Sequence, residues 1–249
     1  MGEGLPAVLE SRTGRLIIAH IEVRKWLYVS SFIIGLIAGF PLGGEIIEWL
    51  LDAEGYVPDG VQVIILQPME VILLQLRIAI QVSIGLTLAV FIVDIAFIGI
   101  GTSQRTAKSL AMGAKASGAL FALLLVVILG SLGLVYAHGV LIPFLLEYLA
   151  EDSASSGLQS TWQLQKWVGF VTGLYFSSMI CFQVPVLVIY LLKYEIMDSE
   201  IISQNRALIW FLALFLGALI SPPDPISLFL VGGPMLVLLE LALLYDRIF

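Results

Sequence analysis

The sequence predicts an all-α polytopic membrane protein with six transmembrane helices. Of its 249 residues, 59% are hydrophobic and 12% are charged, and the mean hydropathy is +1.02. A water-soluble domain of this length could not cover so apolar a composition with polar surface. The apolar runs are continuous rather than alternating, which argues against a transmembrane β-barrel. No repeat, low-complexity tract or linker interrupts the chain, so we expect one domain over residues 1–249.

Six apolar runs, found with a window of about 19 residues, define the predicted helices: 26–44, 71–100, 116–137, 167–192, 207–220 and 226–244. The second run is long enough to extend beyond the lipid. The fifth is only about 21 Å long at 1.5 Å per residue, whereas the hydrocarbon core is about 30 Å thick. It can cross only where the bilayer thins or protein covers its ends. Residues 45–52 alternate apolar and acidic groups at helical spacing, which predicts an amphipathic helix at the interface.

The distribution of charge predicts the orientation. Basic residues gather before the first run, between the second and third, between the fourth and fifth, and after the sixth. The opposite side is mainly acidic, with Lys166 as its base. By the positive-inside rule we expect a multi-pass protein of the cytoplasmic membrane with both termini in the cytoplasm. Segments 46–66 and 139–165 then lie outside.

Polar groups inside apolar runs are the candidate functional residues, because the membrane makes them costly. They are Glu70, Arg77, Asp94, Gln183, Asp224 and Glu240. For Asp94 and Glu240 the alternative is a charge that reaches water at the interface. Gln183 lies deep in the fourth run, two residues before Pro185, so its amide needs a partner within protein. That partner is either a functional contact or a neighbouring helix beside a proline kink.

Residue patterns of enzymes, metal sites and nucleic-acid binding are missing. His20 and His138 are predicted on opposite sides of the membrane, and the single Cys181 can form no intrachain disulfide. No intramembrane histidine accompanies Ser177 and Ser178, as a membrane serine protease would require. We therefore expect no catalytic activity, no cofactor and no metal. The net charge of −7 argues against a nucleic-acid partner.

The stretch LISPPDPISLF (219–229) predicts a rigid turn between the fifth and sixth helices. Pro222 and Pro223 stop one helix, Asp224 is suited to cap the next, and Pro225 fits its first position. Asp224 beside a broken helix pair also resembles a coupling-ion site of a secondary transporter, with Gln183 as its second polar group.

Four segments in order resemble the TatC family, the integral membrane receptor of the twin-arginine protein translocase. They are HIEVRKWL (20–27), LQPMEVILLQLRIAI (66–80), FQVPVLVIYLLKYEIM (182–197) and SPPDPIS (221–227). The resemblance runs almost end to end. It implies a glove-shaped fold with short fifth and sixth helices, whose concave face receives partner helices in the lipid bilayer.

The resemblance also implies a function. Such a protein binds twin-arginine signal peptides of folded cargo at its cytoplasmic face, and assembles with TatA/TatB-like single-span proteins and with copies of itself. The implied signal-peptide residues are Glu22, Arg24, Lys25, Gln104 and Arg105. The implied intramembrane polar residues, which would meet partner helices, are Gln183, Ser221, Asp224 and Glu70.

The segment FIGIGTSQRTAK (97–108) departs from the family pattern, since it lacks the expected proline and tyrosine. Gln104 stands where a glutamate is expected, and an amide cannot replace the charge of a carboxylate that pairs with arginine. Leu228 occupies a position that is often polar. The sequence thus indicates a divergent member. Two alternative functions stay open: a TatC-like scaffold that no longer recognises twin-arginine motifs, and a secondary transporter.

Overall fold

The computed structural model describes residues 12–53, 56–57, 61–102, 111–155, 161–184, 186–187, 207, 210–211, 215 and 225–248. The long helices are α2 (Arg12–Asp52), α3 (Glu70–Thr102), α4 (Ala111–Tyr136), α6 (Leu164–Cys181) and α10 (Pro225–Ile248). Two short strands, β1 (Gln62–Ile64) and β2 (Thr161–Gln163), pair in parallel. The predicted all-α fold is confirmed.

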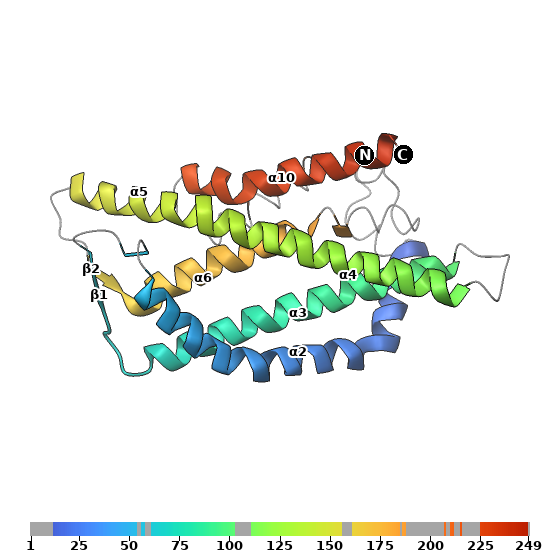
Figure 1. Cartoon of the computed structure of the whole chain (residues 1–249), viewed down its shortest axis with the longest axis horizontal. Coiled ribbons are helices and arrows are strands. Elements are labelled where there is room, and N and C mark those ends of the chain that lie inside the picture. The colour runs from blue at the N-terminus through green and yellow to red at the C-terminus, as the bar shows by residue number, and fades with distance from the viewer. Residues whose placement is uncertain are drawn as a thin grey trace.

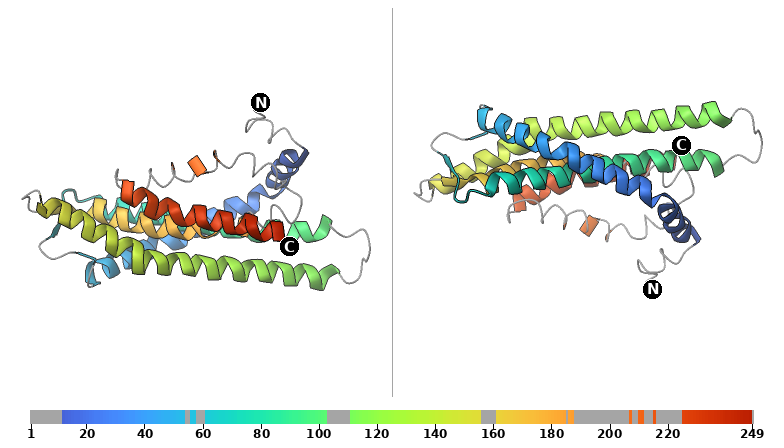
Figure 2. Two further views of the ribbon diagram at one scale, coloured as in Figure 1. Left: turned by 90° about the horizontal axis from the view of Figure 1, so that it is seen from above. Right: turned by 90° about the horizontal axis from the view of Figure 1, so that it is seen from below.

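The long helices run along one common axis (Figure 1). The strands and the end of α5 (Ile142–Ser155) lie at one end of the bundle, which we call the strand end. The beginnings of α2 and α4 and the ends of α3 and α10 lie at the opposite end, which we call the Arg24 end (Figures 1 and 2). The first and last described helices therefore start and finish at the same end, as an even number of crossings requires.

Three helical stretches in the described ranges are long and apolar enough to cross a membrane: Ile21–Asp52, Glu70–Ile95 and Leu120–Glu151. Helix α6 covers part of the fourth predicted run, and α10 covers all of the sixth. The fifth predicted helix is described only at Ala207, Trp210, Phe211 and Phe215, all of them helical. The rest of that run lies outside the described residues.

Two predicted boundaries were wrong. Residues 45–52 form no separate interfacial helix but continue α2, which passes Pro41 without ending. The third helix does not stop at 137, because it continues through a π-helical turn, η1 (Ala137–Leu141), into α5. In both places the added turns bury apolar side chains against the core, namely Ile47, Leu50, Leu141, Ile142, Leu145 and Leu146.

Helices α2 and α3 pack with their backbones in contact. A Cβ atom on Gly35 would lie 2.6 Å from the Cα of Ser83, and one on Gly39 would lie 2.8 Å from the Cα of Ala79. At Gly43 the corresponding distance to the α3 backbone is 3.0 Å. Small residues at four-residue spacing let membrane helices approach this closely, where dispersion and weak polar contacts hold them together.

The buried core is divided into two clusters. The larger lies toward the strand end and gathers Leu50, Tyr56, Leu145, Trp167 and their neighbours. The smaller lies toward the Arg24 end and is formed by Ile92, Ile95, Ala122, Val126 and Val186. Helices α3, α4 and α6 pass from one cluster to the other, and the space between these three helices contains the candidate site.

We predict that Gly35→Ala destabilises the protein by about 1–3 kcal/mol, since overpacking a close contact costs that much. The added methyl group would meet α3 backbone, so the two helices must separate. Gly139→Ala is the matched control, because no atom lies within 4 Å of the added Cβ. Thermal unfolding of the purified protein in detergent gives the comparison. Equal midpoints for both variants would refute the glycine contact as a determinant of stability.

Candidate functional site

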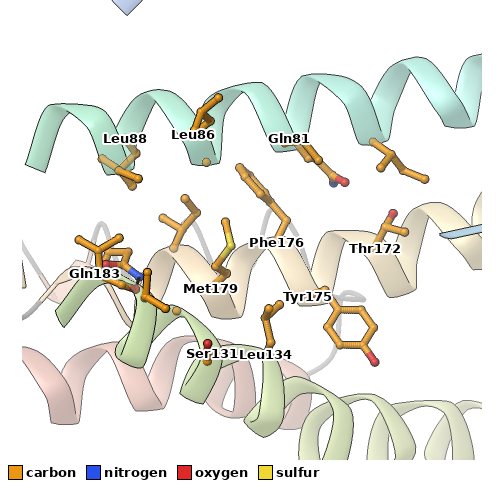
Figure 3. Close-up of a pocket in the computed structure, with 18 of the residues that line it drawn as sticks. Gln81, Leu86, Leu88, Ser131, Leu134, Thr172, Tyr175, Phe176, Met179 and Gln183 are labelled. Atoms are coloured by element: carbon orange, nitrogen blue, oxygen red, sulfur yellow. Dashed lines mark hydrogen bonds between the residues drawn. The ribbon is translucent and has the colours of Figure 1, made fainter. Parts of the chain in front are cut away.

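An apolar groove of about 880 Å³ lies between α3, α4 and α6 (Figure 3). Ligand sites in proteins span about 300–1,000 Å³ and are lined mostly by apolar groups with a few polar ones. Here Leu86, Leu134, Phe176 and Met179 provide apolar wall from all three helices. The polar side chains along the groove include Gln81, Ser131, His138, Thr172, Tyr175 and Gln183.

The helix that carries Gln183 is broken at that residue. Helix α6 ends at Cys181, Phe182 and Gln183 form a turn, and helical geometry resumes when the Leu187 N–H bonds to the Gln183 carbonyl at 3.0 Å. Pro185 carries no N–H, so a helix bond from that residue to the Cys181 carbonyl cannot form. The fourth helix was predicted to run continuously over 167–192, whereas α6 ends at Cys181. The irregular turn that follows carries Gln183, whose side chain bonds to α4.

Gln183 is 6% exposed, and its Nε2 donates to the Val126 carbonyl of α4 at 3.0 Å. The approach is possible because Gly130 has no side chain; a Cβ there would lie 3.1 Å from Nε2. The Oε1 atom has no hydrogen-bond partner among the described residues. A buried acceptor without a donor costs about 1–3 kcal/mol. The amide nitrogen of Gln183 therefore joins the segment after α6 to α4, and the amide oxygen is an acceptor beside the groove.

Helices α4 and α6 are in close backbone contact beside the groove. A Cβ on Gly133 would lie 2.8 Å from the Ser178 carbonyl, and the Ser178 hydroxyl donates to the Gly133 carbonyl at 2.8 Å. On the α3 side, a Cβ on Gly85 would lie 2.7 Å from the terminal methyl of Met179. The groove is thus lined mostly by apolar side chains and is about 880 Å³ in volume, which favours an apolar occupant over a polar one.

At the Arg24 end, a buried carboxylate joins α2 to α3. Arg24 Nη1 donates to Asp94 Oδ1 at 2.7 Å, and the Tyr28 hydroxyl donates to Asp94 Oδ2 at 2.8 Å. The Asp94 side chain is 4% exposed, whereas that of Arg24 is 48% exposed. Asp94 is therefore a paired, internal carboxylate and not an interfacial charge that extends to water. The sequence did not indicate its partner, because the two residues are far apart along the chain.

Glu22 and Lys25 are both exposed on α2. At about 100° per residue, Glu22 lies about 200° around the helix from Arg24, whereas Lys25 is three positions from Glu22 on the same side. The structure thus separates Glu22 from Arg24 and puts a lysine next to the exposed carboxylate. Gln104 and Arg105 lie outside the described residues, so their relation to this surface stays a prediction.

Glu70 is fully buried at the beginning of α3. Its Oε1 accepts bonds from the Leu66 and Gln67 N–H groups, both at 3.0 Å, and from Gln163 Nε2 at 2.7 Å. This carboxylate ties the start of α3 to the junction of β2 and α6. It is not among the residues that line the groove, and Gln183 lies toward the other core cluster. The structure therefore does not bring these two candidates together.

The remaining polar candidates belong to the C-terminal part of the chain. Helix α10 begins at Pro225, as predicted, whereas Ser221 and Asp224 lie outside the described residues. Glu240 of α10 accepts a bond from the Trp210 indole N–H at 3.2 Å. That contact links the fifth predicted run to the sixth.

A second polar cluster, which sequence reasoning missed, lies at the strand end of the groove. The Tyr56 hydroxyl contacts the Tyr175 hydroxyl and lies 2.5 Å from His138 Nδ1, and Tyr175 lies 2.9 Å from the same nitrogen. No spacing along the chain indicates this cluster, because each member comes from a different element. Across the described ranges, no group of three or more His, Cys, Asp or Glu could hold a metal ion.

Comparisons with known proteins give a consistent result. A family model described as Sec-independent protein translocase protein (TatC) matches residues 19–234. The translocase protein TatCy of Bacillus subtilis is 24% identical, and the match covers 92% of this chain and 87% of that protein. TatC of Haemophilus influenzae is 30% identical over 47% of this chain, and this match spans 45% of that protein's length.

The fold has a counterpart among solved structures. The crystal structure of a twin-arginine translocase receptor, TatC, superposes with a TM-score of 0.68 at 20% sequence identity. The superposition covers 93% of this chain and 98% of that one.

Proposed function

The chain belongs to the TatC family of Sec-independent protein translocase proteins, and we propose that it is a membrane receptor of that translocase. In this role it binds twin-arginine signal peptides at its cytoplasmic face and assembles with TatA/TatB-like single-span proteins to export folded cargo. The observation that carries the proposal is the groove with a buried acceptor at one end, Gln183 Oε1, which has no donor among the described residues.

The groove supports the assembly step. An apolar transmembrane helix would fill it by dispersion contacts, and a polar side chain on that helix would supply the donor that Gln183 Oε1 lacks. Hydrogen bonds between membrane helices average about 0.6 kcal/mol and reach about 1.7. Such a bond therefore specifies the register of a partner more than its affinity. The wall of the groove contributes most of the contact area.

The Arg24 end supports the recognition step. Glu22 is an exposed carboxylate on a helix that the rest of the bundle holds in place. A guanidinium group pairs with such a carboxylate through two parallel hydrogen bonds, which lysine cannot reproduce. The orientation with this end in the cytoplasm, inferred from the distribution of basic residues, is part of the proposal.

A scaffold that assembles with single-span partners but does not read twin arginines is the second candidate. It is favoured by Gln104, which stands where a carboxylate is expected, and by Lys25, which lies beside Glu22. A transporter using Gln183 and Asp224 would show ion-dependent uptake in proteoliposomes. Its Gln183 amide already bonds to α4, which leaves less of that side chain for an ion.

We predict that a cysteine at Ser155, in a chain with Cys181→Ala, reacts with an impermeant thiol reagent in intact cells. A cysteine at Lys25 in the same background should react only after lysis, because it lies at the other end of the bundle. The reverse pattern would show that the protein is inserted with its termini outside.

We predict that Glu22→Gln weakens crosslinking of a twin-arginine peptide at least several-fold. The expected loss is about 1.5–3 kcal/mol, the usual value for a hydrogen bond to a charged group. Glu45→Gln is the control, because Glu45 is an exposed glutamate near the other end of the same helix. Unchanged crosslinking in the Glu22 variant would leave that residue as a solvated charge.

We predict that Gln183→Leu remains folded and inserted but loses crosslinks to single-span partners. Gln81→Leu, a matched change in the same groove, should keep them. Gln183→Glu separates the two roles of the amide, since it removes the donor to Val126 yet keeps acceptor oxygens for a partner. Loss of folding in both Gln183 variants would identify the residue as internal packing only, and retained crosslinks in Gln183→Leu would remove it from the partner site.

A further inference from the structure

Asp94 is a carboxylate that already binds a guanidinium group. Its side chain is 4% exposed, and its two oxygens accept separate hydrogen bonds, one from Arg24 Nη1 and one from the Tyr28 hydroxyl. Asp94 belongs to α3 and lies at the Arg24 end of the bundle, where Glu22 also lies. The contact to Arg24 is made through one nitrogen, whereas arginine forms its strongest pairs through two. The structure therefore contains a guanidinium site whose present occupant is a residue of the chain itself.

Arg24 can leave this site without a change of fold. Its side chain is 48% exposed, so rotation of one surface side chain breaks its contact with the carboxylate. Departure without replacement is unfavourable, because a buried charge that loses its partner costs several kcal/mol. Arg24 is thus expected to move only when another cation takes its place.

The two carboxylates at this end suit a pair of adjacent arginines. Glu22 and Arg24 lie about 200° apart around α2, and Arg24 contacts Asp94 of α3. Glu22 and Asp94 therefore lie on opposite sides of the same turn of α2. Successive side chains of an extended peptide also point to opposite sides. An extended twin-arginine segment that crosses this turn therefore presents one guanidinium to each carboxylate.

Resting on the receptor function proposed above, we propose that Asp94 is the second carboxylate that reads the twin arginines, and that Arg24 is an internal competitor displaced on binding. Glu22 reads one arginine at the surface, and Asp94 accepts the other by exchange with Arg24. With Asp94 in this role, recognition does not require a carboxylate at position 104, where this chain has Gln104. Discrimination against lysine follows, since an ammonium group does not reproduce the planar donors that Arg24 gives up.

The test measures binding of a fluorescent twin-arginine peptide to the full-length protein in nanodiscs, with a twin-lysine peptide as control. Asp94→Asn should weaken binding at least about tenfold, the effect of losing one charged hydrogen bond. Arg24→Gln should tighten binding, because it removes the competitor while its amide can still donate to Asp94. If Asp94 serves only to anchor α2, both variants remove the ion pair between α2 and α3 and both weaken binding, which overturns the proposal.

Peptides with citrulline in place of one arginine or the other locate the contact, because citrulline keeps the shape of arginine without its charge. One of the two substitutions should cost affinity in the unmodified protein and nothing further in Asp94→Asn. Equal costs in both proteins overturn the assignment. If Asp94→Asn does not fold, the sign of the change in Arg24→Gln decides alone. If the unmodified chain binds twin-arginine and twin-lysine peptides equally, the receptor function itself fails, and the role of Asp94 with it.

Discussion

The contact between α2 and α3 is the constraint on which the rest of the molecule depends. Gly35 and Gly39 lie against Ser83 and Ala79 with backbone touching backbone, so the two antiparallel helices have one register available. Arg24 comes eleven residues before Gly35, and Asp94 comes eleven residues after Ser83. About three helical turns separate each pair. The glycine contact therefore also sets the distance at which Arg24 meets Asp94, and a shift of one turn would break that ion pair.

The same contact leaves the opposite side of α3 available for the groove. Gln81 and Leu88 face the groove there (Figure 3), while α4 and α6 approach each other through Gly133 and Ser178. Two close helix pairs thus enclose a space that is not filled by side chains of the described residues. A bundle packed to uniform density would have no such space, because protein interiors leave few voids larger than a water molecule.

Most buried polar side chains of the described residues have partners within the chain, and two buried atoms, Glu70 Oε2 and Gln183 Oε1, have none among those residues. Asp94 and Glu70 each have partners from the chain itself, and Ser178 donates to a backbone carbonyl of the neighbouring helix. Lipid offers no hydrogen bonds, so a membrane protein must satisfy such groups internally. At Gln183 the nitrogen donates to the Val126 carbonyl, and the oxygen has no partner among the described residues. Gln183 lines the groove and Glu70 does not, which is the physical basis for expecting a partner at Gln183.

The sequence by itself determined that the chain lies in a bilayer, that it is helical, and that α10 starts at Pro225. Each of these follows from local chemistry: continuous apolar runs need a bilayer, and proline lacks an N–H. It also identified Asp94 and Gln183 as polar groups that required an explanation. Only the tertiary structure decided their partners, the continuation of α2 past Pro41, and the cluster of Tyr56, His138 and Tyr175. Those features depend on which helices pack together and in what register, and a pattern along one helix carries no information about the helix that faces it.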